Sequence, residues 1–416
     1  MIVTRLKLAN VRAIETAELS FKPGFNLVVG VNGVGKTTVL ETLAVCLASV
    51  TKHVNRLRSP LQGFGPEDIR ATADALTVEC GVLLAGEAYT YLIHAPRHAA
   101  VAQTKKSGMP REQTLDTPIR VGFVGNAPPT ADGVRIRRPL AVLFSTRRAV
   151  PSERAATKAA TSGGVSAAFA EAFSTRELRL GEFAAWMRAQ KVLAGEQPQA
   201  ARVLAGFESV VERFLPGYAN LRVTDEQPAR LLIDRRGMTV QVRQLSDGER
   251  GALALVLDLT RRLAQANPEL PDPAGEGEAV VLIDELDLHL HPKWQRQIIK
   301  NLSAAFPRSQ FITTTHSPQV IGEVEHDRIQ IMANGQVFSP THSFGVDSSR
   351  VLEEIMEAPP RTPEVQDLLA RLSREVSAQR IDEATRLMNE LAARLGESDP
   401  EVIRARTLLD FMGGAE

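Results

Sequence analysis

The stretch that decides the fold is Gly30-Val31-Asn32-Gly33-Val34-Gly35-Lys36-Thr37. It matches the phosphate-binding pattern G-x-x-x-x-G-K-[ST] at every specified position. An apolar run at residues 25–29 precedes it, and residues 37–47 follow with apolar side chains at helical spacing. Strand, glycine-rich loop and helix in this order suit phosphate binding, because the loop and the helix N-terminus direct backbone N–H groups at phosphate oxygens.

The loop predicts ATP as ligand, with Mg²⁺. Glycine at positions 33 and 35 lets the backbone approach a phosphate without a Cβ clash. Lys36 is predicted to bridge the β- and γ-phosphates, and the Thr37 hydroxyl to hold Mg²⁺. The predicted nucleotide-binding residues of this segment are Gly30, Asn32, Gly33, Gly35, Lys36, Thr37 and Thr38.

A second candidate feature is the apolar strand at residues 279–283, which ends in Asp284 and Glu285. Two acids at a strand end are common where a strand simply exits into solvent. Beside a phosphate-binding loop, however, Asp284 is predicted to reach Mg²⁺. Glu285 is then predicted to orient and deprotonate the attacking water as a general base.

Composition sets the limits for function. The chain has 416 residues, with 49 basic and 49 acidic side chains, so global charge gives no argument for a nucleic-acid partner. It begins without a signal-peptide pattern and contains no apolar stretch near the roughly 20 residues that span a bilayer. Cys46 and Cys80 lie in apolar runs, which favours buried thiols. We expect a cytoplasmic protein with no membrane contact.

Along the chain, the pattern predicts an α/β fold with a discontinuous core. Residues 1–95 and 241–345 are predicted to form the two halves of the core. Residues 96–240 are predicted to form an inserted arm and helical lobe, because residues 152–215 show helical spacing. Residues 346–416 are predicted to form an all-α tail with helices near 363–378, 382–395 and 399–412.

The segment Leu245-Ser246-Asp247-Gly248-Glu249-Arg250 precedes a long apolar helix. It resembles the Leu-Ser-Gly-Gly-Gln signature of ABC ATPases. Residues 283–292 (IDELDLHLHP), residues 313–318 (TTTHSP) and the opening at residues 8–14 (LANVRAI) resemble the RecF/SMC-like branch of that class, which includes OLD-like ATPases. The resemblance implies an ABC-type P-loop NTPase core.

In this class the signature cannot reach the γ-phosphate of its own chain, so the resemblance implies a head-to-tail homodimer or a higher homo-oligomer. Ser246 and Gly248 would then contact ATP bound to the second copy, and Arg12 is a further candidate nucleotide contact. His316 is predicted to act at the γ-phosphate. A loop histidine satisfied by its neighbours is the alternative for that residue.

Three departures from the family pattern affect the site. Asp247 and Glu249 replace Gly and Gln of the signature, which places extra acid near the nucleotide. The Gln of the family's Q-loop is not evident, and Asp68 is the candidate in its place as a metal ligand. His289 and His291 could bind zinc as a His-x-His pair, but no third ligand lies nearby in the sequence.

The chain also resembles PtuA-type ATPases of Septu and retron anti-phage systems, on residues 139–150 and on the tail from residue 347 onward. That resemblance implies a regulatory or sensor ATPase with an HNH-type nuclease partner. The alternative is a RecF-like DNA-repair ATPase that acts on DNA without a nuclease. The energising subunit of a transporter is a third class, disfavoured by the RecF-like opening and the helical tail.

Local basic clusters suggest a possible contact with nucleic acid that is not sequence-specific. They are Lys105-Lys106, residues 135–138 (RIRR) and Arg147-Arg148. A solvated basic face is the commoner meaning of such runs.

Overall fold

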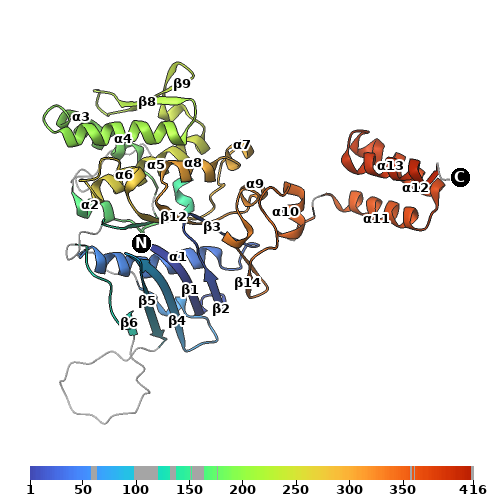
Figure 1. Ribbon diagram of the computed structural model, residues 1–416, viewed down its shortest axis with the longest axis horizontal. Coiled ribbons are helices and arrows are strands. Elements are labelled where there is room, and N and C mark those ends of the chain that lie inside the picture. Colours follow the sequence, from blue (N-terminus) through green and yellow to red (C-terminus); the bar gives the residue numbers. More distant parts are fainter. Residues whose placement is uncertain are drawn as a thin grey trace, which may run out of the picture. The chain divides into compact units, whose positions relative to one another are not determined.

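The computed structural model describes residues 1–57, 63–97, 120–131, 137–149, 151, 164–175, 177–356, 358–359 and 361–413. The chain divides into two compact units (Figure 1), an N-terminal unit of Met1–Ser348 and a C-terminal unit of Ser349–Glu416.

A six-stranded sheet forms the centre of the N-terminal unit. Its strands are β3 (Phe25–Val29), β7 (Leu140–Phe144), β11 (Ala279–Ile283), β12 (Ser309–Thr314), β13 (Ile329–Ala333) and β14 (Gln336–Phe338). Their spatial order is β14-β13-β3-β12-β11-β7, and every pair is parallel except β13 with β14. Every residue of β7 and β11 is buried. Strands of a parallel sheet that are covered on both faces are apolar along their whole length, as these two are.

A five-stranded antiparallel sheet has the order β2-β1-β4-β5-β6. Its strands are β1 (Ile2–Val11), β2 (Ile14–Ser20), β4 (Ala75–Leu84), β5 (Glu87–Pro96) and β6 (Arg120–Phe123). Helix α1 (Lys36–Val54) buries Leu40, Leu43 and Leu47 in one core shared with side chains of both sheets. Helix α1, which begins at the glycine-rich loop, is therefore held in place by packing against side chains of both sheets.

Helices and a small sheet complete the N-terminal unit. The helices are α2 (Val165–Phe169), α3 (Leu180–Leu193), α4 (Pro198–Phe214), α5 (Asp247–Ala266), α6 (Pro273–Glu276), α7 (Pro292–Gln295), α8 (Ile298–Ala305) and α9 (Pro318–Ile321). The sheet β10-β9-β8 contains β8 (Tyr218–Val223), β9 (Leu231–Arg235) and β10 (Met238–Gln241). Figure 1 shows α3, α4, β8 and β9 at one end of this unit and β1, β4 and β5 at the other.

The C-terminal part contains α10 (Ser348–Glu354), α11 (Pro363–Ser377), α12 (Ile381–Leu395) and α13 (Pro400–Gly413). The last three helices share their own core, which includes Leu368, Leu387, Leu391, Val402 and Leu409. Their bounds agree closely with the ranges predicted from the sequence.

The predicted fold class, α/β with a helical tail, is confirmed. The segment predicted as an inserted lobe also supplies an edge strand to the core sheet, because β7 pairs with β11 in parallel register. Cys46 and Cys80 are free thiols in the core. Within the described ranges, no helix is both long and apolar enough to cross a membrane.

Candidate nucleotide-binding site

The sheet order brings four sequence-distant segments to one edge. β3, β12, β11 and β7 are parallel neighbours, so their carboxyl ends lie side by side. The P-loop (residues 30–37) follows β3, His316 follows β12, Asp284 and Glu285 follow β11, and Arg148 follows β7. In parallel α/β sheets this edge is where ligands bind.

The P-loop presents an open helix N-terminus. Gly35 caps α1 in a left-handed conformation, with φ of 104°, and no side chain accepts from the first turn. A Cβ at Gly35 would lie 2.9 Å from the Ile14 side chain, so both φ and space require glycine there. Gly33 also has a positive φ, of 86°. The first N–H groups of α1 are thus available to an anion.

Lys36 is a buried cation in this loop. Its Nζ donates to the carbonyl oxygens of Gly30 at 2.8 Å and Val31 at 2.9 Å. Burial lowers the pKa of Lys36 below its ordinary value, although the nearby Asp284 and Glu285 carboxylates oppose that shift. An ammonium with few solvating partners beside two acids fits a site for phosphate and a divalent cation.

Thr37 and Asp284 meet across 247 positions of sequence. The Thr37 hydroxyl donates to the Asp284 carboxylate at 3.1 Å, and Thr314 Oγ1 donates to Asp284 Oδ1 at 2.6 Å. Hydroxyl and carboxylate oxygens are ligands that Mg²⁺ prefers. The residues present therefore fit this cation, with Thr37 and Asp284 as the pair that would hold it.

Glu285 leaves the strand in an unusual backbone conformation. Its φ is 49°, which is rare for a residue with a Cβ. Its N–H donates to Thr314 Oγ1 at 2.7 Å, and its side chain is only partly buried. The turn directs the chain away from β11 directly after the acid, so the position of the carboxylate depends on backbone contacts.

Arg148 supplies the other backbone contacts. Its guanidinium donates to the carbonyl oxygens of Asp284 and of Glu285, the latter at 2.7 Å. The side chain is buried, and desolvation lowers its pKa to about 10, against the opposing effect of Asp284, Asp287 and Glu285. The interpretation of Arg148 as part of a basic surface cluster is wrong. This arginine holds the acidic strand end from inside the protein.

His316 lies beyond β12 at the same edge and is partly buried. Its backbone N–H donates to Asp287 Oδ1 at 3.3 Å, and Thr315 Oγ1 donates to the same oxygen at 2.5 Å. Asp287 therefore fixes the backbone before His316 without using the imidazole. The ring's predicted contact with the γ-phosphate stays a prediction.

The signature loop (residues 245–250) begins α5 with a complete capping box. Ser246 is the N-cap, its hydroxyl donates to Glu249 Oε2 at 2.8 Å, and the Glu249 N–H donates back to Ser246 Oγ at 3.4 Å. Glu249 Oε1 accepts from Tyr218 at 2.7 Å and pairs with Arg235 at 3.2 Å. Burial alone would raise the pKa of Glu249, but the hydrogen bonds from Tyr218 and Ser246 lower it overall. The acid that replaces Gln in the signature is therefore bound within its own chain.

Gly248 lies against the segment at residues 286–291, the D-loop of the family. A Cβ at Gly248 would lie 2.3 Å from the backbone oxygen of His289. Ser246, Gly248, His289 and His291 line one open groove of about 910 Å³. The second acid of the signature, Asp247, is paired with Arg250 at 2.6 Å.

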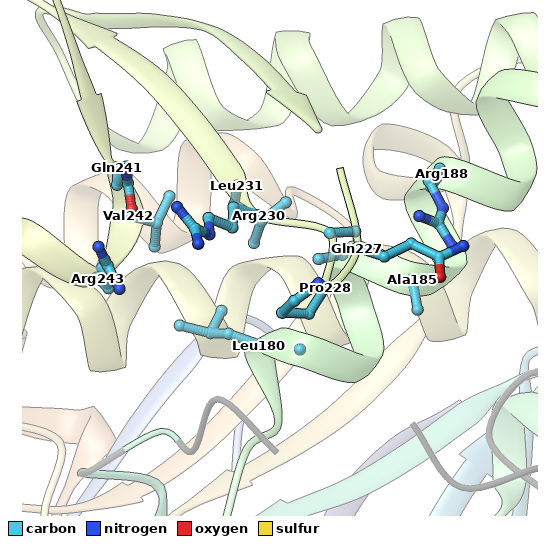
Figure 2. Close-up of a pocket in the computed structure, with 13 residues that line it drawn as sticks. Leu180, Ala185, Arg188, Gln227, Pro228, Arg230, Leu231, Gln241, Val242 and Arg243 are labelled. Atoms are coloured by element: carbon cyan, nitrogen blue, oxygen red, sulfur yellow. The ribbon is translucent and has the colours of Figure 1, made fainter. Parts of the chain in front are cut away.

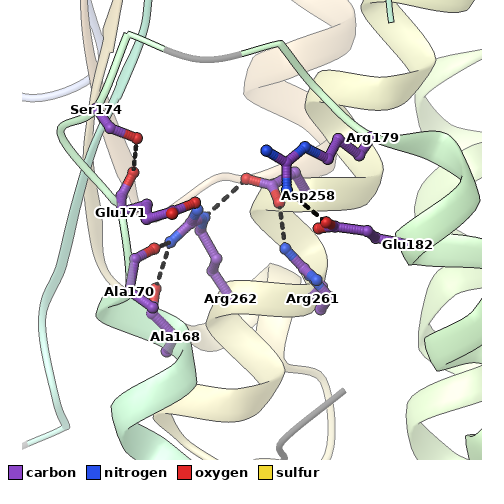
Figure 3. A network of polar contacts seen from close by, with 9 residues as sticks. All are labelled: Ala168, Ala170, Glu171, Ser174, Arg179, Glu182, Asp258, Arg261 and Arg262. Atoms are coloured by element: carbon purple, nitrogen blue, oxygen red, sulfur yellow. Dashed lines mark hydrogen bonds and ion pairs between the residues drawn. The ribbon is translucent and has the colours of Figure 1, made fainter. Parts of the chain in front are cut away.

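The signature helix is anchored far from its N-terminus (Figure 3). The buried Arg262 donates to Asp258 Oδ2 at 2.7 Å and to the backbone oxygen of Ala168 at 2.7 Å. Arg261 donates to the other oxygen of Asp258 at 2.6 Å. This network ties α5 to the α2 segment, so the helix is held along its length.

Arg12 and Asp68 contact each other. Arg12 Nε donates to Asp68 Oδ1 at 2.8 Å, and its Nη1 pairs with Glu41 in α1. Asp68 also accepts from the Gly65 N–H at 2.9 Å. Arg12 thus links Asp68 to Glu41 of α1. Their predicted roles, nucleotide contact for Arg12 and metal ligand for Asp68, stay predictions.

Other predicted features lie elsewhere. Arg137 pairs with Glu276 at 3.2 Å, whereas Lys105, Lys106 and residues 135–136 lie outside the described residues. His291 caps α7 by accepting from the Lys293 N–H at 3.3 Å. No group of three His, Cys, Asp or Glu side chains suited to a metal occurs in the part of the chain that the structure describes.

A separate groove of about 410 Å³ lies between α3 and the β9–β10 sheet (Figure 2). Arg188 lies at one end and Arg243 at the other, with Arg230 between them. None of the predicted site residues lines it, so it is distinct from the nucleotide site.

Models of two protein families match the chain. One, described as "AAA domain, putative AbiEii toxin, Type IV TA system", matches residues 187–322, and one described as "AAA domain" matches residues 5–106. The second match contains the P-loop. The first contains the signature loop, the acidic strand end and His316.

Curated relatives match shorter stretches. The chain is 43% identical over 165 residues to the "Retron Ec83 probable ATPase" of Escherichia coli, covering 39% of this chain and 30% of the relative. It is 40% identical over 78 residues to the Septu protein PtuA of Bacillus mycoides (strain KBAB4), covering 19% and 10%. The chain thus spans less than a third of the length of these relatives.

Among solved structures, an SMC head bound to the C-winged helix domain of ScpA aligns with a TM-score of 0.47 at 13% identity, covering 82% of this chain and 98% of that chain. The family models and the curated relatives confirm the predicted resemblance to RecF/SMC-like P-loop ATPases with members in defence systems.

Proposed function

We propose that this chain, a P-loop ATPase of the RecF/SMC-like branch, binds Mg·ATP between two copies of itself and hydrolyses it there. One observation carries the proposal. The open P-loop, the Thr37–Asp284 pair and Glu285 converge at the carboxyl edge of one parallel sheet. Such convergence supports phosphoryl transfer to water, which depends on positioning and charge stabilisation.

In this mechanism Lys36 and the first N–H groups of α1 bind the β- and γ-phosphates. Thr37 and Asp284 would hold Mg²⁺, which would supply positive charge to neutralise the charge that develops on the phosphate oxygens. Glu285 orients the attacking water and takes its proton as the water oxygen bonds to the γ-phosphorus. The bond between the γ-phosphorus and the β–γ bridging oxygen breaks in the same step, so that ADP leaves. His316 donates to a γ-phosphate oxygen. Arg148 keeps Glu285 in place through the backbone.

The second copy contributes Ser246 and Gly248 from its signature loop. The N-terminus of α5 attracts an anion, and Ser246 is an exposed residue. For Ser246 to donate to a γ-phosphate, its hydroxyl must turn away from Glu249, which retains Tyr218 and Arg235 as partners. The signature can therefore engage ATP without leaving a buried acid unpaired.

A mixing experiment tests the shared site. Lys36→Ala removes the P-loop cation and Ser246→Arg blocks the signature, so each variant alone should be inactive. In a mixed dimer, one composite site combines the intact P-loop of one copy with the intact signature of the other. An equal mixture should regain about a quarter of wild-type turnover if dimers form at random. A mixture that stays inactive while both variants remain folded contradicts the shared site.

We further propose that the chain is the regulatory or sensor ATPase of an anti-phage defence system with an HNH-type nuclease partner. The retron and Septu relatives support this role. The tagged chain, purified from cells that express its native gene neighbourhood, should co-purify with a nuclease in a fixed ratio by native mass spectrometry. A chain that returns alone, or with gapped DNA and repair proteins, favours the RecF-like alternative.

A further inference from the structure

The last helix of the chain exposes a set of large apolar side chains. α13 directs Val402 and Leu409 into the core of the C-terminal unit. On its other side, Ile403 is 52% exposed, Leu408 is 44% exposed and Phe411 is 78% exposed. Three such residues on one 14-residue helix form a local apolar surface of the kind that marks an interaction site.

Four exposed residues of α13 are arranged symmetrically about Thr407. An α-helix turns by about 100° per residue, so positions three and four residues away on either side share one face. Ile403 and Phe411 are the apolar residues at four positions, and Arg404 and Asp410 are the charged residues at three. All five are exposed. We call them the α13 face. The face is complementary to itself when one copy runs in the reverse direction.

We propose that the α13 face pairs with the α13 face of a second copy, antiparallel, about a two-fold axis at Thr407. Ile403 of each copy then packs near Phe411 of the other. Each Arg404 lies level with Asp410 of the other copy. A two-fold contact repeats every interaction twice, so even a short helix supplies two apolar and two ionic contacts.

The charges identify a second copy as the occupant. Within the described C-terminal unit, Arg404 and Asp410 have no ion pair, whereas the neighbouring Arg406 is paired with Glu397. In a parallel pair about the same face, Asp410 would lie beside Asp410 and Arg404 beside Arg404. Only the antiparallel pairing brings opposite charges and apolar residues together at once.

This contact is independent of the nucleotide. It uses residues of the C-terminal unit, whereas the ATP dimer of the proposed function uses the P-loop and signature loop. Because α13 is short, the contact should be weak on its own. Two different two-fold contacts on one chain link dimers into larger assemblies.

The first test measures the mass of the full chain by sedimentation velocity over a concentration series without nucleotide. The wild type should shift from 45.3 kDa toward twice that mass as concentration rises. Phe411→Glu should weaken this association by at least about tenfold. Ile381→Glu, at a 38% exposed apolar position on α12, is the matched control and should not change it. A wild type that stays at 45.3 kDa at every concentration overturns the proposal.

Charge reversal decides the register. Arg404→Glu and Asp410→Arg should each weaken association several-fold because like charges then meet. The double variant should restore it, since every pair is again opposite in sign. Failure of the double variant to recover overturns antiparallel self-pairing and points to a foreign helix on this face. Repeating the series in Lys36→Ala separates the result from the ATP dimer, because the tail contact should persist there.

Discussion

The P-loop and the signature loop are both turns at a helix N-terminus, yet the chain treats them in opposite ways. The N-cap of α1 in the P-loop is Gly35, and no side chain caps the helix. The N-cap of α5 in the signature loop is Ser246, which forms a complete capping box with Glu249. Tyr218 and Arg235 then satisfy the remaining oxygen of Glu249.

The difference matters for how each loop can bind phosphate. The open P-loop offers its N–H groups with no bond to break, so it suits primary binding of ATP. The capped signature loop must exchange the Ser246–Glu249 bond for one to phosphate. Binding there is a second, more conditional step, as expected of a loop that acts on ATP held by another copy.

The largest expected effect is on the open loop. Lys36→Ala removes the only charged side chain of the P-loop. ATP binding should weaken by roughly 100-fold, or about 2.7 kcal/mol, because charge-assisted hydrogen bonds are lost. Lys52→Ala makes the same change in the last turn of α1 and should leave affinity unchanged. Isothermal titration with ATP measures both, and equal affinities for the two variants would show that the P-loop does not depend on this cation.

Substitution of Arg148 tests the contacts that hold the backbone of Asp284 and Glu285, beside the P-loop. Arg148→Met leaves the carbonyl oxygens of Asp284 and Glu285 without a buried donor, so the free energy of unfolding should fall by about 2 kcal/mol. Turnover should fall more than ATP affinity, because Glu285 loses its support while the P-loop does not.

The neighbouring Arg147→Met is the matched control for this variant, since Arg147 is exposed. Urea unfolding and steady-state kinetics compare the pair. If the two variants behave alike, the carbonyl contacts of Arg148 have no role in stability or turnover.

Local pattern was sufficient for much of this site. The P-loop, the strand before Asp284 and the apolar helix after the signature each rest on residues adjacent in sequence, so their types and order predict them. The three helices of the tail are also local, because their apolar residues recur at helical spacing.

Long-range packing explains what the sequence did not reveal. Arg148 stands beside Arg147, and nothing local distinguishes the buried residue from the exposed one. The apolar run of β7 is visible in the sequence, but only its pairing with β11 places it in the core sheet. Similarly, the sequence predicts Glu249 to be an extra acid near ATP. Only the structure shows that Tyr218 and Arg235 from the small sheet bind its carboxylate.

Gly248 tests how tightly the signature loop packs against the D-loop. Gly248→Ala forces a Cβ against the backbone oxygen of His289, so one segment must move, at a cost of about 1–3 kcal/mol. Gly206→Ala, in α4 with nothing within 4 Å of the new Cβ, should instead stabilise by about 0.5–1 kcal/mol. Thermal unfolding of the two variants should therefore shift in opposite directions. A Gly248→Ala protein as stable as the wild type would mean that the D-loop backbone at His289 can move away from the new Cβ without loss of folding free energy.

The smallest effect concerns the charge of the cap. Glu249→Gln can keep the capping box but loses the ion pair with Arg235, so we expect a loss of about 1 kcal/mol at pH 7. The folded pKa of Glu249 lies below its ordinary value of 4.5. Its charge therefore contributes stability that is fully present above pH 4.5 and is lost as pH falls through the folded pKa.

The difference in melting temperature between wild type and Glu249→Gln should accordingly stay constant from pH 7 to about pH 5 and shrink toward pH 3. Other acids titrate in both proteins and cancel in this difference. Glu208→Gln, at an exposed position of α4, should show almost no difference at any pH. A gap that persists undiminished at pH 3 would mean that Glu249 holds the signature loop by shape alone. The signature loop would then differ from the open P-loop only in the hydrogen bonds of its cap, and the charge of Glu249 would have no part in the difference.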